Sequence, residues 1–156
     1  MSPVAPLAAR SPAPVREKRL VLRVLELWHQ ACDGDLLPIL GAVGEADAGE
    51  DAPHIFRIDL LHAAGPRFAY IGEALRGRGW PQGDTPLVAT APEQSVLGLV
   101  GRCWREIVER GVPVTRGGVA SNDGISVLYR SIMAPLADDR GQVAGILGAA
   151  NWRPVA

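Results

Sequence analysis

Histidine and cysteine are the side chains best suited to metal binding or nucleophilic chemistry, and this chain has few of them. Cys32 and Cys103 lie far apart, and neither belongs to a Cys-x-x-Cys motif or has a nearby histidine pair. A zinc site or a disulfide framework would need such spacings. His29, His54 and His62 fit structural or exposed roles better than ligand roles. The sequence therefore predicts no metal centre and indicates a reducing compartment.

Acidic side chains offer no better case for catalysis. Asp59, Glu73 and Asp123 could in principle form a carboxylate pair for acid–base chemistry, but their spacing brings no two together. The chain also lacks a Gly-x-Ser-x-Gly elbow, a phosphate-binding Gly-x-x-x-x-Gly-Lys-Ser/Thr loop and a His-Glu-x-x-His helix. We therefore expect these carboxylates to be solvated, and we expect no enzymatic activity.

Composition limits the molecule to one domain and narrows its partners. The chain has 156 residues, 47% of them hydrophobic, which suits one compact domain with an ordinary core. Sixteen basic against seventeen acidic side chains give a net charge of −1, so nucleic acid and anionic membranes are disfavoured partners. No apolar run approaches the roughly 20 residues needed to span a bilayer, and no signal peptide is evident. These features predict a cytoplasmic protein.

An N-terminal tail and an amphipathic helix open the chain. Residues 1–14 are rich in proline and small side chains and are expected to be a flexible tail, followed by a single domain over 15–152. Apolar residues recur at helical spacing across 15–32, which predicts an amphipathic helix. This helix either covers its own core or contacts a partner such as a second copy. The contact residues would then be Leu20, Val24, Leu27 and Trp28.

The remaining sequence predicts a small α+β unit that ends in three strands. Residues 41–52 are expected to be a loop, and 72–80 to hold no more than single-turn helices. A long helix over 93–110, begun by Pro92 and ended by Gly111, would bury Val96, Val100, Cys103, Trp104, Ile107 and Val108. Gly98 and Gly101 inside it indicate either close packing, a ligand against the backbone, or simple tolerance. Strands are expected at 54–61, 67–71, 112–114, 125–135 and 143–150, with a turn at 138–141.

This order of elements resembles a PAS domain, and in particular the compact bacterial PAS subgroup that begins with a Trp-bearing helix. The resemblance extends over roughly residues 20–150. Two segments depart from the pattern: 36–52 lacks the usual Asp-Pro step, and 77–85 lacks the Gly-x-x-x-x-Gly spacing that closes the short helices. The matching segments are Leu27-Trp28 and residues 53–59, 67–72, 108–114, 134–139 and 145–149.

The resemblance implies a five-stranded antiparallel sheet in the order 2-1-5-4-3, with helices on one face and an extra N-terminal helix. A cavity between the sheet and these helices could hold a small molecule. Large side chains are expected either to line that cavity or simply to fill the core. Arg130 could anchor an anionic ligand or face solvent. The candidate lining residues are Phe56, Tyr70, Trp80, Trp104 and Met133.

Known cofactors of PAS domains leave chemical marks that can be sought here. Haem needs an axial ligand, and residues 93–110 contain no histidine. A photoactive flavin domain would place its reactive cysteine in an Asn-Cys-Arg-Phe context, whereas Cys103 lies between Arg102 and Trp104. The sequence therefore disfavours both haem and a photoactive flavin and leaves the cofactor unknown. It favours inert packing over redox sensing for Cys103, whose role stays open.

The resemblance implies a stand-alone sensory or protein-interaction domain in signal transduction. Its signal would pass to a partner chain, either a second copy in a homodimer or another signalling protein, with or without a small-molecule ligand. The main alternative is a structural adaptor with a filled core that binds only protein. A small cystatin-like enzyme is a third class, and the residues give it no support.

Overall fold

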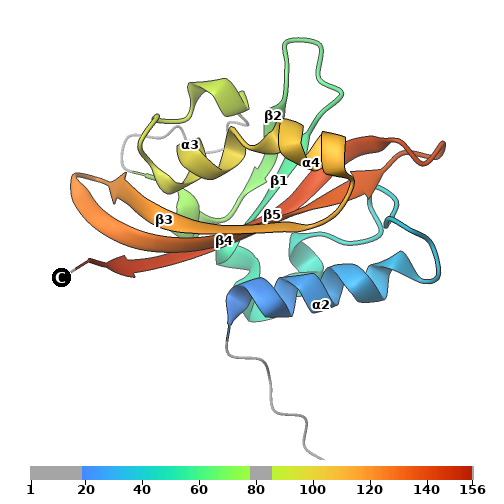
Figure 1. Ribbon diagram of the computed structural model, residues 1–156, viewed down its shortest axis with the longest axis horizontal. Coiled ribbons are helices and arrows are strands. Elements are labelled where there is room, and N and C mark those ends of the chain that lie inside the picture. Colours follow the sequence, from blue (N-terminus) through green and yellow to red (C-terminus); the bar gives the residue numbers. More distant parts are fainter. Residues whose placement is uncertain (1–18, 78–85, 156) are drawn as a thin grey trace, which may run out of the picture.

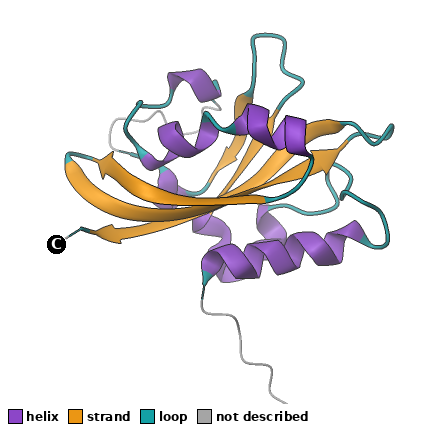
Figure 2. Cartoon of the chain, viewed as in Figure 1, coloured by secondary structure: helices purple, strands orange, loops and turns teal. Residues whose placement is uncertain are grey.

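A single antiparallel sheet organises the molecule. The computed structural model describes residues 19–77 and 86–155. Its five strands lie in the order β2-β1-β5-β4-β3, which confirms the predicted topology (Figure 1). Helices cover both faces: the N-terminal helix packs on one face, and the helices between the second and third strands pack on the other (Figures 1 and 2). The strands are β1 (Ile55–Asp59), β2 (Arg67–Ile71), β3 (Val114–Asn122), β4 (Ile125–Ala137) and β5 (Val143–Pro154).

The central pair, β4 and β5, supplies most of the interior because its side chains alternate between the two faces. Ile132 and Ala134 of β4 belong to the core beneath the N-terminal helix, whereas Met133 belongs to the core on the other face. On β5, Leu147 belongs to the core beneath the N-terminal helix and Ile146 to the core on the other face. Two hydrophobic cores therefore share the same two strands.

The helix α2 (Leu20–Cys32) lies within the predicted 15–32 helix and begins after Arg19, whose extended backbone caps it. Its buried residues Leu20, Val21, Val24 and Trp28 face β4 and β5. The Trp28 indole N–H donates a hydrogen bond of 2.8 Å to the carbonyl of Pro135 on β4. Arg23 makes a two-pronged ion pair with Asp51, with N–O distances of 2.8 and 2.9 Å. An apolar stripe, one buried hydrogen bond and one ion pair thus fix α2 on the sheet.

The segment predicted as one long helix over 93–110 is two short helices, α3 (Val96–Gly101) and α4 (Trp104–Arg110). The helical pattern breaks at Arg102 and Cys103. A Cβ on Gly101 would lie 3.0 Å from Val88 and 3.3 Å from the Phe68 ring, so close packing, one of the readings left open, holds this glycine here. The Arg102 guanidinium donates to the carbonyl of Glu93 at 2.9 Å and braces the start of α3.

The ends of these helices also differ in part from expectation. Ser95, rather than Pro92, begins α3: its hydroxyl accepts a hydrogen bond of 3.0 Å from the Gly98 amide, as N-cap side chains do. Gly111 ends α4 in the left-handed conformation, with φ of 64°, as predicted. Val108, expected in the core, is exposed.

Two further segments depart from the sequence prediction. Residues expected to be a loop form a 3-10 helix, η1 (Glu45–His54), kinked at Gly49. The short strand predicted at 112–114 overlaps the nine-residue β3 only at Val114, and β3 forms one edge of the sheet and is mostly exposed. Its glycines and polar residues show no alternation of apolar side chains, so the sequence pattern did not indicate that the strand continues beyond Val114. Two single-turn helices, η2 (Glu73–Leu75) and η3 (Val88–Thr90), complete the fold.

Candidate functional site

The space between the sheet and the helices α3 and α4 is where the resemblance places a ligand. Phe56, Met133 and Trp104 lie there: Phe56 and Met133 are buried in the core on this face of the sheet, and the half-buried Trp104 packs against that core. Phe68 of β2 completes the group, with its ring centroid 5.9 Å from that of Phe56 at an interplanar angle of 81°. The four side chains form an aromatic and apolar cluster beneath α3 and α4.

The side chain of Phe56 fills the middle of this cluster. A Cβ on Gly148, in the neighbouring strand β5, would lie 2.2 Å from the Phe56 ring. The absence of a side chain at Gly148 therefore makes room for that ring over the centre of the sheet.

Tyr70 does not join this cluster. The pairing of β1 with β2 shifts register between Arg57 and Ile58, so that Tyr70 faces the α2 side of the sheet while Phe68 faces the other. Its hydroxyl donates a hydrogen bond of 3.2 Å to the carbonyl of Ala52, and burial raises the pKa of this phenol. The prediction that Tyr70 lines the same cavity as Phe56 is wrong. Trp80, the fifth predicted lining residue, lies outside the described residues.

A polar cluster borders the same space where α4 passes over β3. Arg116 of β3 forms an ion pair with Glu106 of α4, which also pairs with Arg110 at 3.0 Å. The hydrogen bond from Arg116 lowers the pKa of the Glu106 carboxyl, and Arg110 acts in the same direction. Next to them, burial raises the pKa of Tyr129, and the nearby Cys103 adds to that rise. Sequence reasoning missed this cluster, because Arg116 lies in the part of β3 beyond the strand predicted at 112–114.

The predicted partner contacts on α2 are mostly inside the protein. Leu20, Val24 and Trp28 are buried against the chain's own sheet, and Leu27 is half-buried. The helix therefore covers its own core, the first of its two predicted roles. A partner could touch the three buried residues only if α2 left the sheet.

Surface hollows lie elsewhere on the molecule. One hollow, on the α2 side of β3, β4 and β5, is lined by Arg130, Asn151 and Arg153 and has a volume of about 570 Å³. Arg130 is thus exposed at a hollow and not in the aromatic cluster. A larger groove of about 800 Å³ lies between the C-terminal end of α2, the turn joining β4 to β5, and the end of α4. The leucine-rich stretch at residues 36–40, to which we assigned no structural role, provides one wall of this groove.

Neither a metal site nor a membrane-spanning helix is found among residues 19–77 and 86–155. No three His, Cys, Asp or Glu side chains there gather closely enough to hold a metal ion. No helix in the same ranges is long and apolar enough to cross a bilayer.

Comparison with known proteins finds similarity in structure alone. No model of a protein family matches the chain, and neither does any curated protein. The light-state structure of the blue-light photoreceptor Aureochrome1 LOV is similar at 15% identity and a TM-score of 0.45, over 67% of this chain and 82% of that one. A cysteine-to-serine mutant of Vivid is similar at 15% identity and a TM-score of 0.48, over 82% and 98%. A variant of the fungal photoreceptor VVD is similar at 16% identity and 0.47, over 83% and 93%.

These neighbours correct the expectation about cofactors. We expected a photoactive flavin to be disfavoured, and that prediction is contradicted because photoreceptor LOV domains are among the similar structures. At such low identity the likeness concerns the fold and not the chemistry of the site. The sheet order 2-1-5-4-3 and the helices joining β2 to β3 across one face match the predicted architecture. The chain therefore has a PAS-like fold.

Proposed function

We propose that the chain is a non-enzymatic sensory and protein-interaction domain of the cytoplasm, acting in signal transduction through a partner chain. The supporting observation is that one sheet separates two cores and contributes to both. A shift of the side chains under α3 and α4 can move β4 and so change the packing of α2, because the adjacent β4 residues Met133 and Ile132 face opposite cores.

The proposed signal begins at the aromatic cluster. A small molecule bound beside Phe56, Trp104 and Met133 would displace the Phe56 ring, which fills the space over Gly148. Such a displacement gives the ligand-bound and ligand-free states different contacts, and only differential contacts can shift a conformational equilibrium. The affected strand, β5, also carries Leu147, which packs in the core beneath α2.

The proposed output is a change in how firmly α2 is held. Its attachment depends on the Trp28–Pro135 hydrogen bond and the Arg23–Asp51 ion pair. When α2 loosens, its buried apolar residues become available to a second copy or to another signalling protein. Leu22, already 39% exposed, and the half-buried Leu27 offer the first contact in that event.

The test combines ligand detection with hydrogen exchange. Protein purified from its own host is examined by native mass spectrometry and by its ultraviolet–visible spectrum, which together detect a bound small molecule with or without colour. Amide exchange of Leu20–Cys32 is then compared before and after the bound molecule is removed. We expect a bound molecule and a change in α2 exchange. Unchanged α2 exchange despite loss of the ligand would refute the proposed route.

A second function is favoured by the same packing of Phe56. Because its ring already fills the centre of the cluster, the domain can serve as a ligand-free adaptor that only binds protein. This alternative predicts that protein from the native host carries no small molecule in repeated preparations. It also predicts that no candidate metabolite raises the melting temperature, since a ligand that binds only the folded state must do so.

A further inference from the structure

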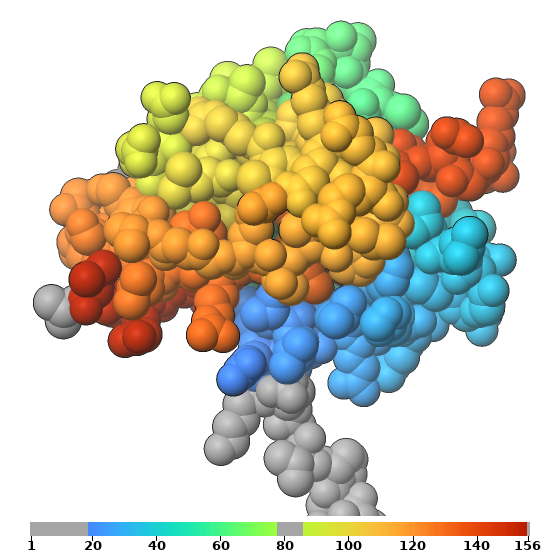
Figure 3. Space-filling view, in the orientation of Figure 1, coloured from blue at the N-terminus to red at the C-terminus, as the bar shows by residue number. Residues whose placement is uncertain are grey.

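The groove near the C-terminal end of α2 combines exposed apolar side chains with carboxylates. Leu36 is 92% exposed, Ile39 51% and Val112 43%, and all three line the groove. Clusters of large apolar residues on a surface usually mark interaction sites, whereas single ones are ordinary. The three come from two separate segments, Leu36 and Ile39 from the 33–41 loop and Val112 from the residues after α4, which the fold brings together at one end of the molecule (Figure 3).

The groove is held in shape by backbone hydrogen bonds. The amide of Leu40 donates to the carbonyl of Ala137 at 2.8 Å, and the amide of Ala137 donates to the carbonyl of Pro38 at 2.8 Å. These bonds pin the loop alongside the end of β4. Trp28, fixed by its own hydrogen bond to Pro135, also lines the groove. A preformed site of this kind loses little conformational entropy when it binds a partner.

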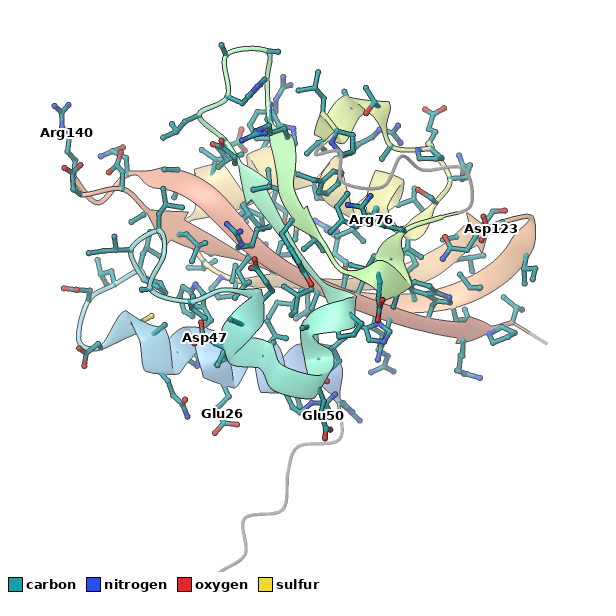
Figure 4. The ribbon with its side chains drawn as sticks, turned by 180° about the vertical axis from the view of Figure 1, so that it is seen from behind. Glu26, Asp47, Glu50, Arg76, Asp123 and Arg140 are labelled. Carbon is teal, nitrogen blue, oxygen red and sulfur yellow. The ribbon has the colours of Figure 1, made fainter. Side chains whose placement is uncertain are left out.

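The charged residues that line the groove are all acidic. Asp35, Asp138 and Asp139 line it, and none of them forms an ion pair with any residue in the described ranges. Asp138 accepts hydrogen bonds of 2.9 Å from the amides of Arg140 and Gln142, which close the turn without neutralising the carboxylate. The Arg140 side chain extends outward from the tip of this turn (Figure 4). The groove therefore presents uncompensated negative charge beside apolar surface.

We propose that this groove binds a segment of a partner protein in which apolar side chains stand next to lysine or arginine. The apolar residues of that segment cover Leu36, Ile39 and Val112, and its cations lie against Asp35 and Asp139. Complementary charge at the edge of an apolar contact selects the partner and speeds its association. The inference deepens the proposed signalling role, on which it rests, by naming the chemistry of the partner.

Selection of short random peptides displayed on phage tests this proposal with the full-length chain. We expect the selected peptides to combine apolar residues with an excess of Lys and Arg. Their affinity should fall at least about tenfold on Leu36→Ser and on the double variant Asp35→Asn/Asp139→Asn, because each removes one half of the recognition. All three positions are exposed, so these variants should fold, and far-ultraviolet circular dichroism verifies it.

Matched controls remove the same groups elsewhere. Leu61→Ser removes a leucine that is 67% exposed, and Glu26→Gln/Glu93→Gln removes two exposed carboxylates; both should leave peptide affinity unchanged. Failure to select any peptide, selection of peptides without basic excess, or equal binding to the groove variants would overturn the proposal. These binding results do not depend on how the amide exchange of α2 changes when a ligand is removed. The proposed function is therefore tested separately by that exchange experiment.

The selected peptides and the Leu36→Ser variant also test two other possible occupants of the groove, this chain's own N-terminal residues and a second copy of the chain. A synthetic peptide of residues 1–18 carries Arg10, Arg16 and Lys18 against one acid, Glu17. If it displaced the selected peptides, the occupant would be this chain's own tail and not a partner. If light scattering showed a dimer that Leu36→Ser dissociated, the occupant would be a second copy. Either result overturns the proposal of a different partner protein.

Discussion

Gly148 leaves no room for a side chain beside the Phe56 ring. A Cβ there would meet three atoms of the Phe56 ring at 2.2, 2.5 and 2.6 Å, and neither Gly148 nor Phe56 is exposed. We expect Gly148→Ala to lower the free energy of unfolding by about 1–3 kcal/mol, as overpacking of a core does. Urea unfolding measures this change in the free energy of unfolding. Gly44→Ala, whose added Cβ would lie 3.8 Å from the Arg57 side chain in ordinary contact, is the control and should shift stability by no more than about 0.5 kcal/mol. Equal effects would show that Phe56 is free to move.

The ion pair of Glu45 with Arg57 makes a prediction about pH. Hydrogen bonds from the Arg57 guanidinium, at 2.7 and 3.1 Å, lower the pKa of Glu45 in the folded chain. The resulting stability is fully present above the ordinary glutamate pKa and is lost as the pH falls through the lowered folded value. Both side chains are partly exposed, 34% for Arg57 and 27% for Glu45, so the contribution is about 0.2–1 kcal/mol.

The measurement compares urea unfolding of the protein with that of Glu45→Gln across this pH range. The variant should be less stable than the natural chain at neutral pH, and the difference should shrink on acidification. Glu26→Gln, which removes an exposed carboxylate of α2, is the control. A difference that stayed constant with pH would mean that the carboxylate charge of Glu45 contributes nothing.

At the scale of elements, α2 depends on Trp28 for its attachment. Trp28→Phe keeps an aromatic ring but leaves the carbonyl of Pro135 without its indole donor, in a buried place. We expect a loss of about 1–3 kcal/mol and faster amide exchange across Leu20–Cys32. Hydrogen-exchange mass spectrometry reports both local and global changes. Trp152→Phe, a half-buried tryptophan of β5, serves as the control, and exchange of α2 should not respond to it.

The elements also show what the sequence could and could not predict. Strand β2 was predicted with its observed bounds because turn residues mark where it begins and ends. Strand β3 was predicted too short, because an exposed edge strand needs no alternating apolar residues. The two-helix break at Arg102 was missed because no proline marks it, and it depends on the packing of Gly101 against Phe68. Local pattern reveals elements that bury a regular stripe, and tertiary contacts decide the others.

The candidate site was half predictable for a related reason. Phe56 and Met133 were placed together correctly, since each lies at an inward position of a well-marked strand. Tyr70 was misplaced because the register shift between β1 and β2 reverses the faces that a strict two-residue alternation would assign. The groove around Leu36 was not foreseen at all. It combines segments that are distant in sequence, and only the folded chain brings them together.

At the scale of the whole molecule, the shared sheet predicts cooperative unfolding. Because β4 and β5 supply side chains to both cores, neither core can persist when the other is lost. We expect the fluorescence of Trp28, in a variant whose other tryptophans are phenylalanine, to change at the same urea concentration as far-ultraviolet circular dichroism. An earlier fluorescence transition would show that α2 detaches while the sheet stays folded.

The exposed edge formed by β3 has a practical consequence for handling this protein. Its outer backbone amides and carbonyls face no neighbouring strand, except where Ser121 donates to the carbonyl of Gln94 at 2.8 Å. Such an edge is a template for adding foreign strands. Concentrated solutions of the protein should therefore form fibrils over time, which thioflavin T fluorescence detects. Gly117→Pro should delay the onset of that fluorescence.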